Sequence, residues 1–453
     1  MKPTIKCSIN SVNNNFLESV KYAIQTFAGY IGLPAVFDDS DPDIVYYNDK
    51  KEIIENNNSL LEIRFNEKFY SEFSFNDEIE RIIKSIQNKK YSELLRGNEL
   101  TFDLFGLIFQ LNNINHPYKI ESMIIYELLK FICSDIFKLK DSDTQQFLKE
   151  PIAMFTHDVD QVNINSIAHT LKFIESAVKN KDYKSFIYAA SQFKKRIFST
   201  KAINEINYEE YLETENKFGC KSAFYFTCLG SDRDNIDPLY DLNAKLIYNK
   251  ITVKELWKRI LENGNEIGLH SSVYSIKRET QKELKNELQR MRSEIPELKG
   301  IRAHTLRVSE NFYKILDEEK IEYDSSYSYN EMIGYRSGHF LPFYPFIDGG
   351  RLSVLIIPFS FMDSILAHQN GYPKNENEKN MHFEIIKIHI DSIIKSKGIM
   401  VFNWHFRTVN HYRMPYMFEI YKNILEYLNE KKIKFVRPCD FALSYKKYLN
   451  QFF

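Results

Sequence analysis

Short apolar runs alternate with amphipathic stretches along the last two thirds of the chain, from about residue 150 onward. The apolar runs have the length of strands, whereas the stretches between them carry apolar residues at helical spacing. The predicted strands are IAMFTHD, SAFYFTCL, EIGLHSS, GIRAHTL, IEYDSSYSY, LSVLIIPFSF, IMVFNWHF and IKFVRP. Strands that alternate with helices in this way predict a mostly parallel sheet. About eight strands over roughly 300 residues favour an α/β fold of the (β/α)7-8 barrel type, complete or distorted, over an open sheet.

The first third of the chain has a different pattern. Residues 1–115 contain short strand-like runs such as PDIVYYN and LLEIRF, together with an amphipathic helix in FLESVKYAIQTFAGYIG, and they predict a smaller N-terminal α/β domain. Residues 116–150 have a helical pattern and are predicted to be a connector. The second domain then spans residues 151–453. A helical insertion at about 165–205 is predicted to be either a flap beside the active site or a passive packing element.

Composition limits the classes of function. The chain carries 60 basic and 61 acidic residues, and this near-zero balance argues against a dedicated nucleic-acid-binding protein. The five cysteines are scattered without a CxxC pair, which is typical of reduced thiols. The chain shows neither a signal-peptide pattern nor an apolar run of about 18 residues, so we expect a soluble cytoplasmic protein without a membrane span.

Titratable residues gather at the ends of the predicted strands. The first strand, in AMFTHDVDQV, ends in three such groups within four positions. The strand-end residues are His157, Asp158 and Asp160, His270, Arg302 and His304, Asp324, and His405 and Arg407. In barrel enzymes the catalytic groups lie at the carboxyl ends of the strands, where the loops begin. The sequence therefore predicts an active site at this edge.

Alternation along the strands predicts which of these side chains face one another. Residues two apart in a strand share a face. The pairs predicted to point inward are Asp158 with Asp160, Arg302 with His304, and Asn403 with His405, whereas Ala303, Phe402 and Trp404 would face the outer helices. Two aspartates and several histidines at a barrel mouth favour a divalent metal, with one carboxylate left as a general base.

These segments resemble the polysaccharide deacetylase superfamily, also called the NodB-homology superfamily or carbohydrate esterase family four. The segments that carry the resemblance are THDVD, EIGLHSS, GIRAHTLR, YDSSYSY followed by GYRSGHFLPFYPFI, and FNWHF, over about residues 150–445. They look most like a bacterial branch whose first motif reads HDVD and which often carries an N-terminal domain of unknown function. FDLFGLIFQLNN looks like the end of that domain.

The resemblance implies a metal-dependent hydrolase that removes N- or O-acetyl groups from sugars, and a carbohydrate as its substrate. By position, Asp158 matches the family's catalytic base, Arg302 the arginine that orients this base, and His405 the general acid. Asp160 and His270 match metal ligands. The implied cofactor is a divalent metal, zinc or alternatively cobalt or nickel.

The chain departs from the family pattern at the metal site. Val159 separates the two aspartates, and Tyr274 stands where a second histidine ligand is usual. His304 replaces a proline of the family and is predicted to supply the missing ligand, with His157 as a second candidate. In GYRSGHF, Arg336 is predicted to bind substrate, although a structural ion pair remains an alternative. Asp324 would either tune His405 or cap a turn.

Two other functions remain open from the sequence. The same residues could serve another metal-dependent C–N hydrolase that acts on a linear or cyclic amide. Alternatively, the chain could be a catalytically degenerate barrel that binds glycan or acts as a scaffold in polysaccharide biosynthesis. Tyr274 in place of histidine is the feature that favours this second alternative.

Overall fold

The structure is a computed structural model, and it describes residues 4–10, 12, 14–38, 42–47, 61–66, 70, 81–82, 84–86, 88–97, 99–113, 123–139, 148–160, 175, 178, 208–227, 251–272, 281–409 and 414–453. Most of the predicted insertion at about 165–205 lies outside the described residues, as does Tyr274. The four described cysteines are free thiols, in agreement with the expectation for them.

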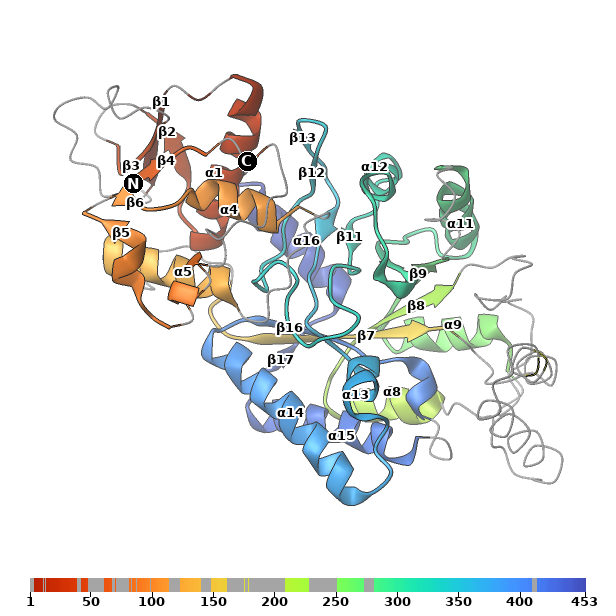
Figure 1. Ribbon diagram of the computed structural model, residues 1–453. Helices are drawn as coiled ribbons and strands as arrows, with labels where there is room; N and C mark the ends of the chain where they lie inside the picture. Colours follow the sequence, from red (N-terminus) through yellow and green to blue (C-terminus); the bar gives the residue numbers. More distant parts are fainter. Residues whose placement is uncertain are drawn as a thin grey trace.

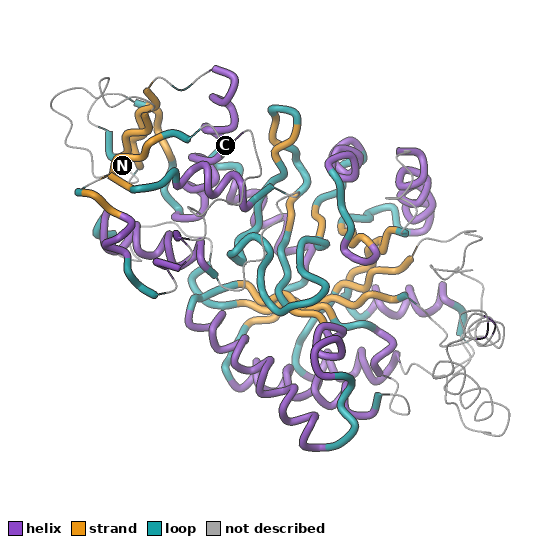
Figure 2. The backbone as a smooth tube through the Cα atoms, viewed as in Figure 1, coloured by secondary structure: helices purple, strands orange, loops and turns teal. Residues whose placement is uncertain are grey.

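A parallel sheet forms the centre of the larger, C-terminal part (Figures 1 and 2). The strand order is β14-β11-β10-β9-β8-β7-β16-β15, and β17 pairs with β7. The strands are β7 Ile152–Val159, β8 Ala223–Thr227, β9 Glu266–Ser271, β10 Gly300–Ala303, β11 Tyr323–Asp324, β14 Leu355–Ile356, β15 Phe361–Met362, β16 Ile399–Asn403 and β17 Lys434–Phe435. The sheet curls into a half-barrel, which confirms the predicted α/β fold in its distorted form.

Burial explains why these strands read as continuous apolar runs. Every residue of β7 is buried, which is typical of a parallel sheet that is covered on both faces. The covering helices are α8 Tyr208–Lys217, α9 Val253–Glu262, α11 Gln281–Glu294, α12 Glu310–Glu318, α13 Asp363–Asn370, α14 Glu376–Lys395, α15 Pro415–Glu430 and α16 Pro438–Leu449. A short antiparallel hairpin, β12 Phe346–Ile347 and β13 Gly350–Arg351, stands apart from the sheet.

The N-terminal part has a sheet and a hydrophobic core of its own, as predicted for a smaller α/β region. The strand order is β2-β1-β3-β4-β6-β5, and only β5 is antiparallel to its neighbour. The elements are β1 Ile5–Asn10, α1 Leu17–Ile31, β2 Ala35–Phe37, β3 Ile44–Tyr47, β4 Leu61–Arg64, β5 Leu95–Arg96, β6 Glu99–Leu100 and α4 Leu104–Leu111. Within the predicted connector, α5 Ile124–Phe131 continues as a π-turn, Ile132–Ile136, and packs on this N-terminal core.

Among the described residues, the structure contains no helix that is both long enough and apolar enough to cross a bilayer.

Asp103 joins the start of α4 to the N-terminal sheet. Its Oδ1 accepts a hydrogen bond from Gly106 N at 2.8 Å and so caps the helix. Its Oδ2 accepts from the Tyr46 hydroxyl at 2.7 Å and from Asn66 N at 3.0 Å. Burial raises the pKa of Asp103 to about 7, against the partly compensating effect of these hydrogen bonds.

The raised pKa of Asp103 predicts a pH-dependent contribution to stability. Because the native pKa of about 7 lies above the unfolded value, the native chain binds this proton more tightly. The stabilisation is present in full below the unfolded pKa and is lost as the pH rises through about 7. The side chain of Asp103→Asn cannot titrate. From pH 5 to pH 7.5 the free energy of unfolding of the wild type is therefore expected to fall relative to that of the variant. Urea-induced unfolding at both pH values measures this, and a pH-independent difference would contradict it.

Candidate functional site

The polar residues predicted at the strand ends lie at one edge of the curled sheet. Because β7, β9, β10 and β16 belong to one parallel sheet, their carboxyl ends meet at the same edge. The register places Arg302 beside His270 on neighbouring strands. Residues far apart in the sequence are therefore neighbours at this edge.

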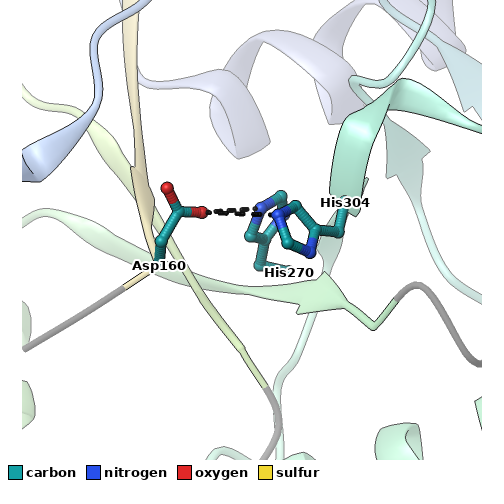
Figure 3. Close-up of side chains that lie close together, drawn as sticks. All are labelled: Asp160, His270 and His304. Carbon is teal, nitrogen blue, oxygen red and sulfur yellow. Dashed lines mark ion pairs between the residues drawn. The ribbon is translucent and has the colours of Figure 1, made fainter. Parts of the chain in front are cut away.

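Asp160, His270 and His304 form a compact group of three donors. Their ligand atoms all lie within 4.8 Å of one another. Asp160 Oδ1 is 3.3 Å from His270 Nε2 and 4.0 Å from His304 Nε2, so both imidazoles point at the same carboxylate oxygen (Figure 3). One carboxylate and two imidazoles in this arrangement fit a divalent transition metal such as zinc.

Two further observations support this fit. Asp160 Oδ1 is buried and makes no hydrogen bond of regular geometry, although such an oxygen normally has a partner. The Nδ1 atom of His270 lies 3.0 Å from the carbonyl oxygen of Arg302, which can only accept. Nδ1 therefore carries the proton, and Nε2 presents its lone pair to the group. Metal-binding histidines are commonly oriented in this way.

Arg407 pairs with the other oxygen of the Asp160 carboxylate. Its Nη1 atom contacts Oδ2, and the ion pair leaves Oδ1 facing the two histidines. Burial raises the pKa of Asp160, but the close contact with His270 and the charges of Arg407 and His405 outweigh it and hold the pKa well below its usual range. The sequence marked Arg407 as a strand-end cation without indicating this contact.

Asp158 is buried beside this group and has two donors of its own. Arg302 Nη1 lies 3.3 Å from Oδ1, and Asn403 Nδ2 donates to Oδ2 at 2.7 Å. Burial raises the pKa of Asp158, but the nearby positive charge, chiefly that of Arg302, outweighs this effect, so the net shift is downward. The carboxylate is therefore ionised at neutral pH.

Arg302 is fully buried between two aromatic rings. Its guanidinium carbon lies 4.8 Å from the ring centre of Tyr225 and 4.5 Å from that of Phe359. Nε donates to the carbonyl oxygen of Ser325 at 2.7 Å, and Nη2 donates to the Ser325 hydroxyl at 2.9 Å. The Tyr225 ring needs a glycine at Gly268, where a Cβ would lie 2.5 Å from the ring. These contacts leave Nη1 directed at Asp158.

His405 is oriented by Asp363, the first residue of α13. The Nδ1 atom of His405 lies 2.5 Å from Asp363 Oδ1, and its backbone N–H donates to Oδ2 at 3.1 Å. The opposite ring atom, Nε2, lies 3.9 Å from Asp160 Oδ2 and so faces the group. Asp324 instead accepts hydrogen bonds from the Tyr313 hydroxyl and Ser326 N, which favours the turn-capping alternative for this residue. The sequence offered no signal for Asp363 beyond its place after a strand.

His157 faces away from the group, as its alternation with Asp158 indicated. Its Nδ1 atom donates to the carbonyl oxygen of Trp404 at 2.9 Å, and its Nε2 lies 2.7 Å from Glu215 Oε1. Both side chains of the pair are almost completely buried. Glu215 also accepts from Ser222 and Tyr421. His157 therefore ties β7, α8 and the end of β16 together, and this geometry does not suit a metal ligand.

The residues of GYRSGHF lie in the loop after β11. The Arg336 guanidinium stacks on the ring of Tyr327, at 5.1 Å from its centre. His339 is buried and contacts Tyr30 and Asn112 of the N-terminal part. His339 is thus placed as a structural residue, and a substrate contact of Arg336 stays a prediction.

The fold and the donor set define a candidate metal centre at the carboxyl edge of a barrel-type sheet. Residues 249–414 match the sequence model of a family described as WbmS-like: Polysaccharide deacetylase. This segment is therefore similar to the polysaccharide deacetylases, in agreement with the motifs. It contains His270, Arg302, His304 and His405, whereas Asp158 and Asp160 precede it.

Comparison with curated proteins finds no match. Among solved structures, one similar protein comes from Mycobacterium smegmatis and is assigned to the polysaccharide deacetylases, with 15% identity over 64% of this chain and 95% of that chain and a TM-score of 0.36. Puue allantoinase is 13% identical over 65% of this chain and 90% of the allantoinase chain, with a TM-score of 0.42. A Bordetella bronchiseptica protein is assigned to the polysaccharide deacetylases of O-antigen biosynthesis. It is 11% identical over 66% of this chain and 90% of the Bordetella chain, with a TM-score of 0.30. Similarities this distant carry no argument about function.

The buried pair of His157 and Glu215 predicts a large effect on stability. His157→Leu is expected to lower the free energy of unfolding by about 3–5 kcal/mol, because the buried carboxyl group of Glu215 would lose its His157 partner. Lys258→Gln breaks an exposed ion pair with Glu262 and is expected to change it by less than about 0.5 kcal/mol. Urea-induced unfolding compares the three proteins. A loss below about 1 kcal/mol for His157→Leu would show that the pair is not structural.

The three-donor group predicts that the purified protein binds zinc. His270→Ala is expected to weaken zinc binding at least about a hundredfold, because it removes one of the three ligand atoms. Arg407→Ala is expected to weaken it about tenfold, because the Asp160 carboxylate loses the partner that orients it. His368→Ala, an exposed histidine on α13, is the control and should bind zinc as wild type does. Competition with a chromogenic chelator measures the affinities, and unchanged binding by His270→Ala would exclude this site.

Proposed function

We propose that the protein is a metal-dependent hydrolase that removes an N- or O-acetyl group from an amino sugar or a polysaccharide precursor. The observation that carries this proposal is the pairing, at one edge of the sheet, of an ionised buried carboxylate with a separate group of three metal-type donors. The family match over residues 249–414 supports the type of reaction. The expected cytoplasmic location favours a precursor over a finished cell wall as substrate.

A divalent metal held by Asp160, His270 and His304 would polarise the acetyl carbonyl and lower the pKa of the attacking water. Asp158 is proposed to accept the proton of this water as its oxygen forms the bond to the carbonyl carbon. Arg302 and Asn403 hold the Asp158 carboxylate at both oxygens, so its direction is set before the substrate binds.

His405 is proposed to complete the reaction from the other side of the group. Asp363 accepts a hydrogen bond from Nδ1, and in the doubly protonated form of the ring Nε2 also carries a proton, which it can pass to the leaving atom. When the C–N bond of an N-acetyl sugar breaks, this proton passes to the nitrogen, and acetate and a free amine are the products. In an O-acetyl sugar, the leaving oxygen takes the proton in the same way.

These roles predict a pair of strongly impaired variants. Asp158→Asn is expected to lower kcat for acetate release about 10²–10⁴-fold, because the amide cannot accept the proton. His405→Gln should lower kcat within the same range and should affect substrates with poor leaving groups most. Asp348→Asn changes an exposed carboxylate in the β12–β13 turn and should leave kcat unchanged. Acetate release from N-acetylated amino sugars is the assay.

The same assay separates the alternatives. Release of ammonia from small linear or cyclic amides, without release of acetate from sugars, would replace the deacetylase by an amide hydrolase. Wild-type protein that binds no zinc, cobalt or nickel and releases neither product would indicate a glycan-binding or scaffold protein instead.

A further inference from the structure

The end of α4 contacts the large loop between β11 and β12, residues 325–345. The hydroxyl of Tyr327 donates to the carbonyl oxygens of Leu111 and Asn113, at 3.3 and 3.2 Å. Asn112, between these two residues, contacts His339 of the same loop. These contacts join FDLFGLIFQLNN to GYRSGHF, two motifs for which the proposed reaction gives no role.

The contact of Asn112 with His339 is part of a buried hydrogen-bond network. His339 Nδ1 accepts from Leu341 N at 3.2 Å, so the proton must lie on Nε2. Nε2 then donates to Asn112 Oδ1 at 2.8 Å, and Asn112 Nδ2 donates to the Tyr30 hydroxyl at 2.9 Å. Burial lowers the pKa of His339 to about 3, which agrees with a neutral ring. A buried network of this kind favours one arrangement of the two parts.

The loop depends on contacts of this kind because it has little structure of its own. Residues 325–345 contain no helix and no strand, and one isolated bridge, between Phe343 and Ile356, ties the loop to the sheet. Loops of this length without secondary structure are uncommon in compact domains and are often functional. Most of this loop is nevertheless buried, so tertiary contacts must hold its backbone in place.

The same loop supplies the groups that hold Arg302. Ser325 accepts from Arg302 at both its carbonyl and its hydroxyl oxygen, and the hydroxyl of Ser326 accepts from Ala303 N at 2.8 Å. The carbonyl oxygen of Tyr327 accepts from Phe359 N at 3.3 Å, and the Phe359 ring stacks on Arg302. Tyr327 therefore contacts the N-terminal part through its hydroxyl and supports the surroundings of Arg302 through its backbone.

We propose that the N-terminal α/β region is a positioning element of the active site. The end of α4 holds the loop 325–345, and the loop holds Arg302 against Asp158. The expected change in turnover rests on the proposed function, whereas the expected change in the order of the loop is independent of that function. Tyr327, His339 and Asn112 are positioning residues, because they act through Arg302 and do not reach the reacting atoms.

The test compares variants at two contacts that join the N-terminal and C-terminal parts, one made by the loop 325–345 and one made by α16. Tyr327→Phe removes the hydroxyl that donates to Leu111 and Asn113. Asn112→Ala removes the hydrogen bond to His339. The two substitutions are made separately and in combination. Tyr448→Phe is the matched control. It loses a buried hydrogen bond of 2.7 Å to the Gly29 carbonyl oxygen, which also joins the two parts but comes from α16 instead of the loop. Each of these hydrogen bonds contributes a similar stability.

The combined variant Asn112→Ala/Tyr327→Phe is expected to lower kcat about tenfold, with KM and zinc affinity within twofold of wild type, because Arg302 moves while the metal donors stay in place. Amide hydrogen exchange should become faster in residues 300–306 and 323–331. Tyr448→Phe should leave kcat and the exchange of both segments as in wild type. Tyr327→Phe alone should show the same changes to a smaller degree and guards against a folding defect of the combined variant.

Two outcomes would overturn the inference. One is that exchange in residues 300–306 and 323–331 is the same in the combined variant and in Tyr448→Phe. The other is that the wild type releases acetate and the exchange increases in the combined variant, but the kcat of this variant does not fall. If wild type releases no acetate, the proposed function fails by that result, and the exchange measurement still decides whether α4 orders the loop.

Discussion

The placement of a buried carboxylate, Asp158, and a partly buried one, Asp160, at the end of one strand is the constraint on which the rest of the site depends. Asp158 and Asp160 follow a run of buried residues, and an ionised carboxylate in such a place is costly unless it is paired. Asp158 is compensated by Arg302 and Asn403, and Asp160 by Arg407 and the neighbouring histidines. One oxygen of Asp160 is left without a hydrogen bond of regular geometry, and this is the oxygen at which the donors converge.

The supporting contacts divide into two groups that reach the site from opposite sides. His157 and Glu215 tie β7 to α8 and to the end of β16 behind the carboxylates. On the other side, the loop 325–345 holds Arg302 and is itself held by the end of α4. The N-terminal region thus contributes to the same arrangement as the barrel helices, although it lies far from the strand ends in the sequence (Figure 1).

Local patterns predicted much of this arrangement. All eight predicted strand segments of the larger part contain strand residues, and LSVLIIPFSF contains β14 and the first residue of β15. Alternation correctly separated Asp158 from His157, since neighbours in a strand point to opposite faces. It gave no indication of Arg407 or Asp363, because both lie just outside regular strands, where the backbone no longer alternates. Strand periodicity also gave no indication of Glu215, because this residue lies on helix α8, far from His157 in the sequence.

The sequence by itself determined the parallel α/β fold, the strand ends at which titratable residues gather, and the opposite faces of Asp158 and His157, because these follow from the period of the backbone and from burial. Only the tertiary structure decided which charges compensate one another and which loop holds Arg302. These pairings join residues that are distant in sequence, and nothing in the local pattern distinguishes one distant partner from another. The curl of the sheet and the docking of α4 bring the partners within hydrogen-bonding distance.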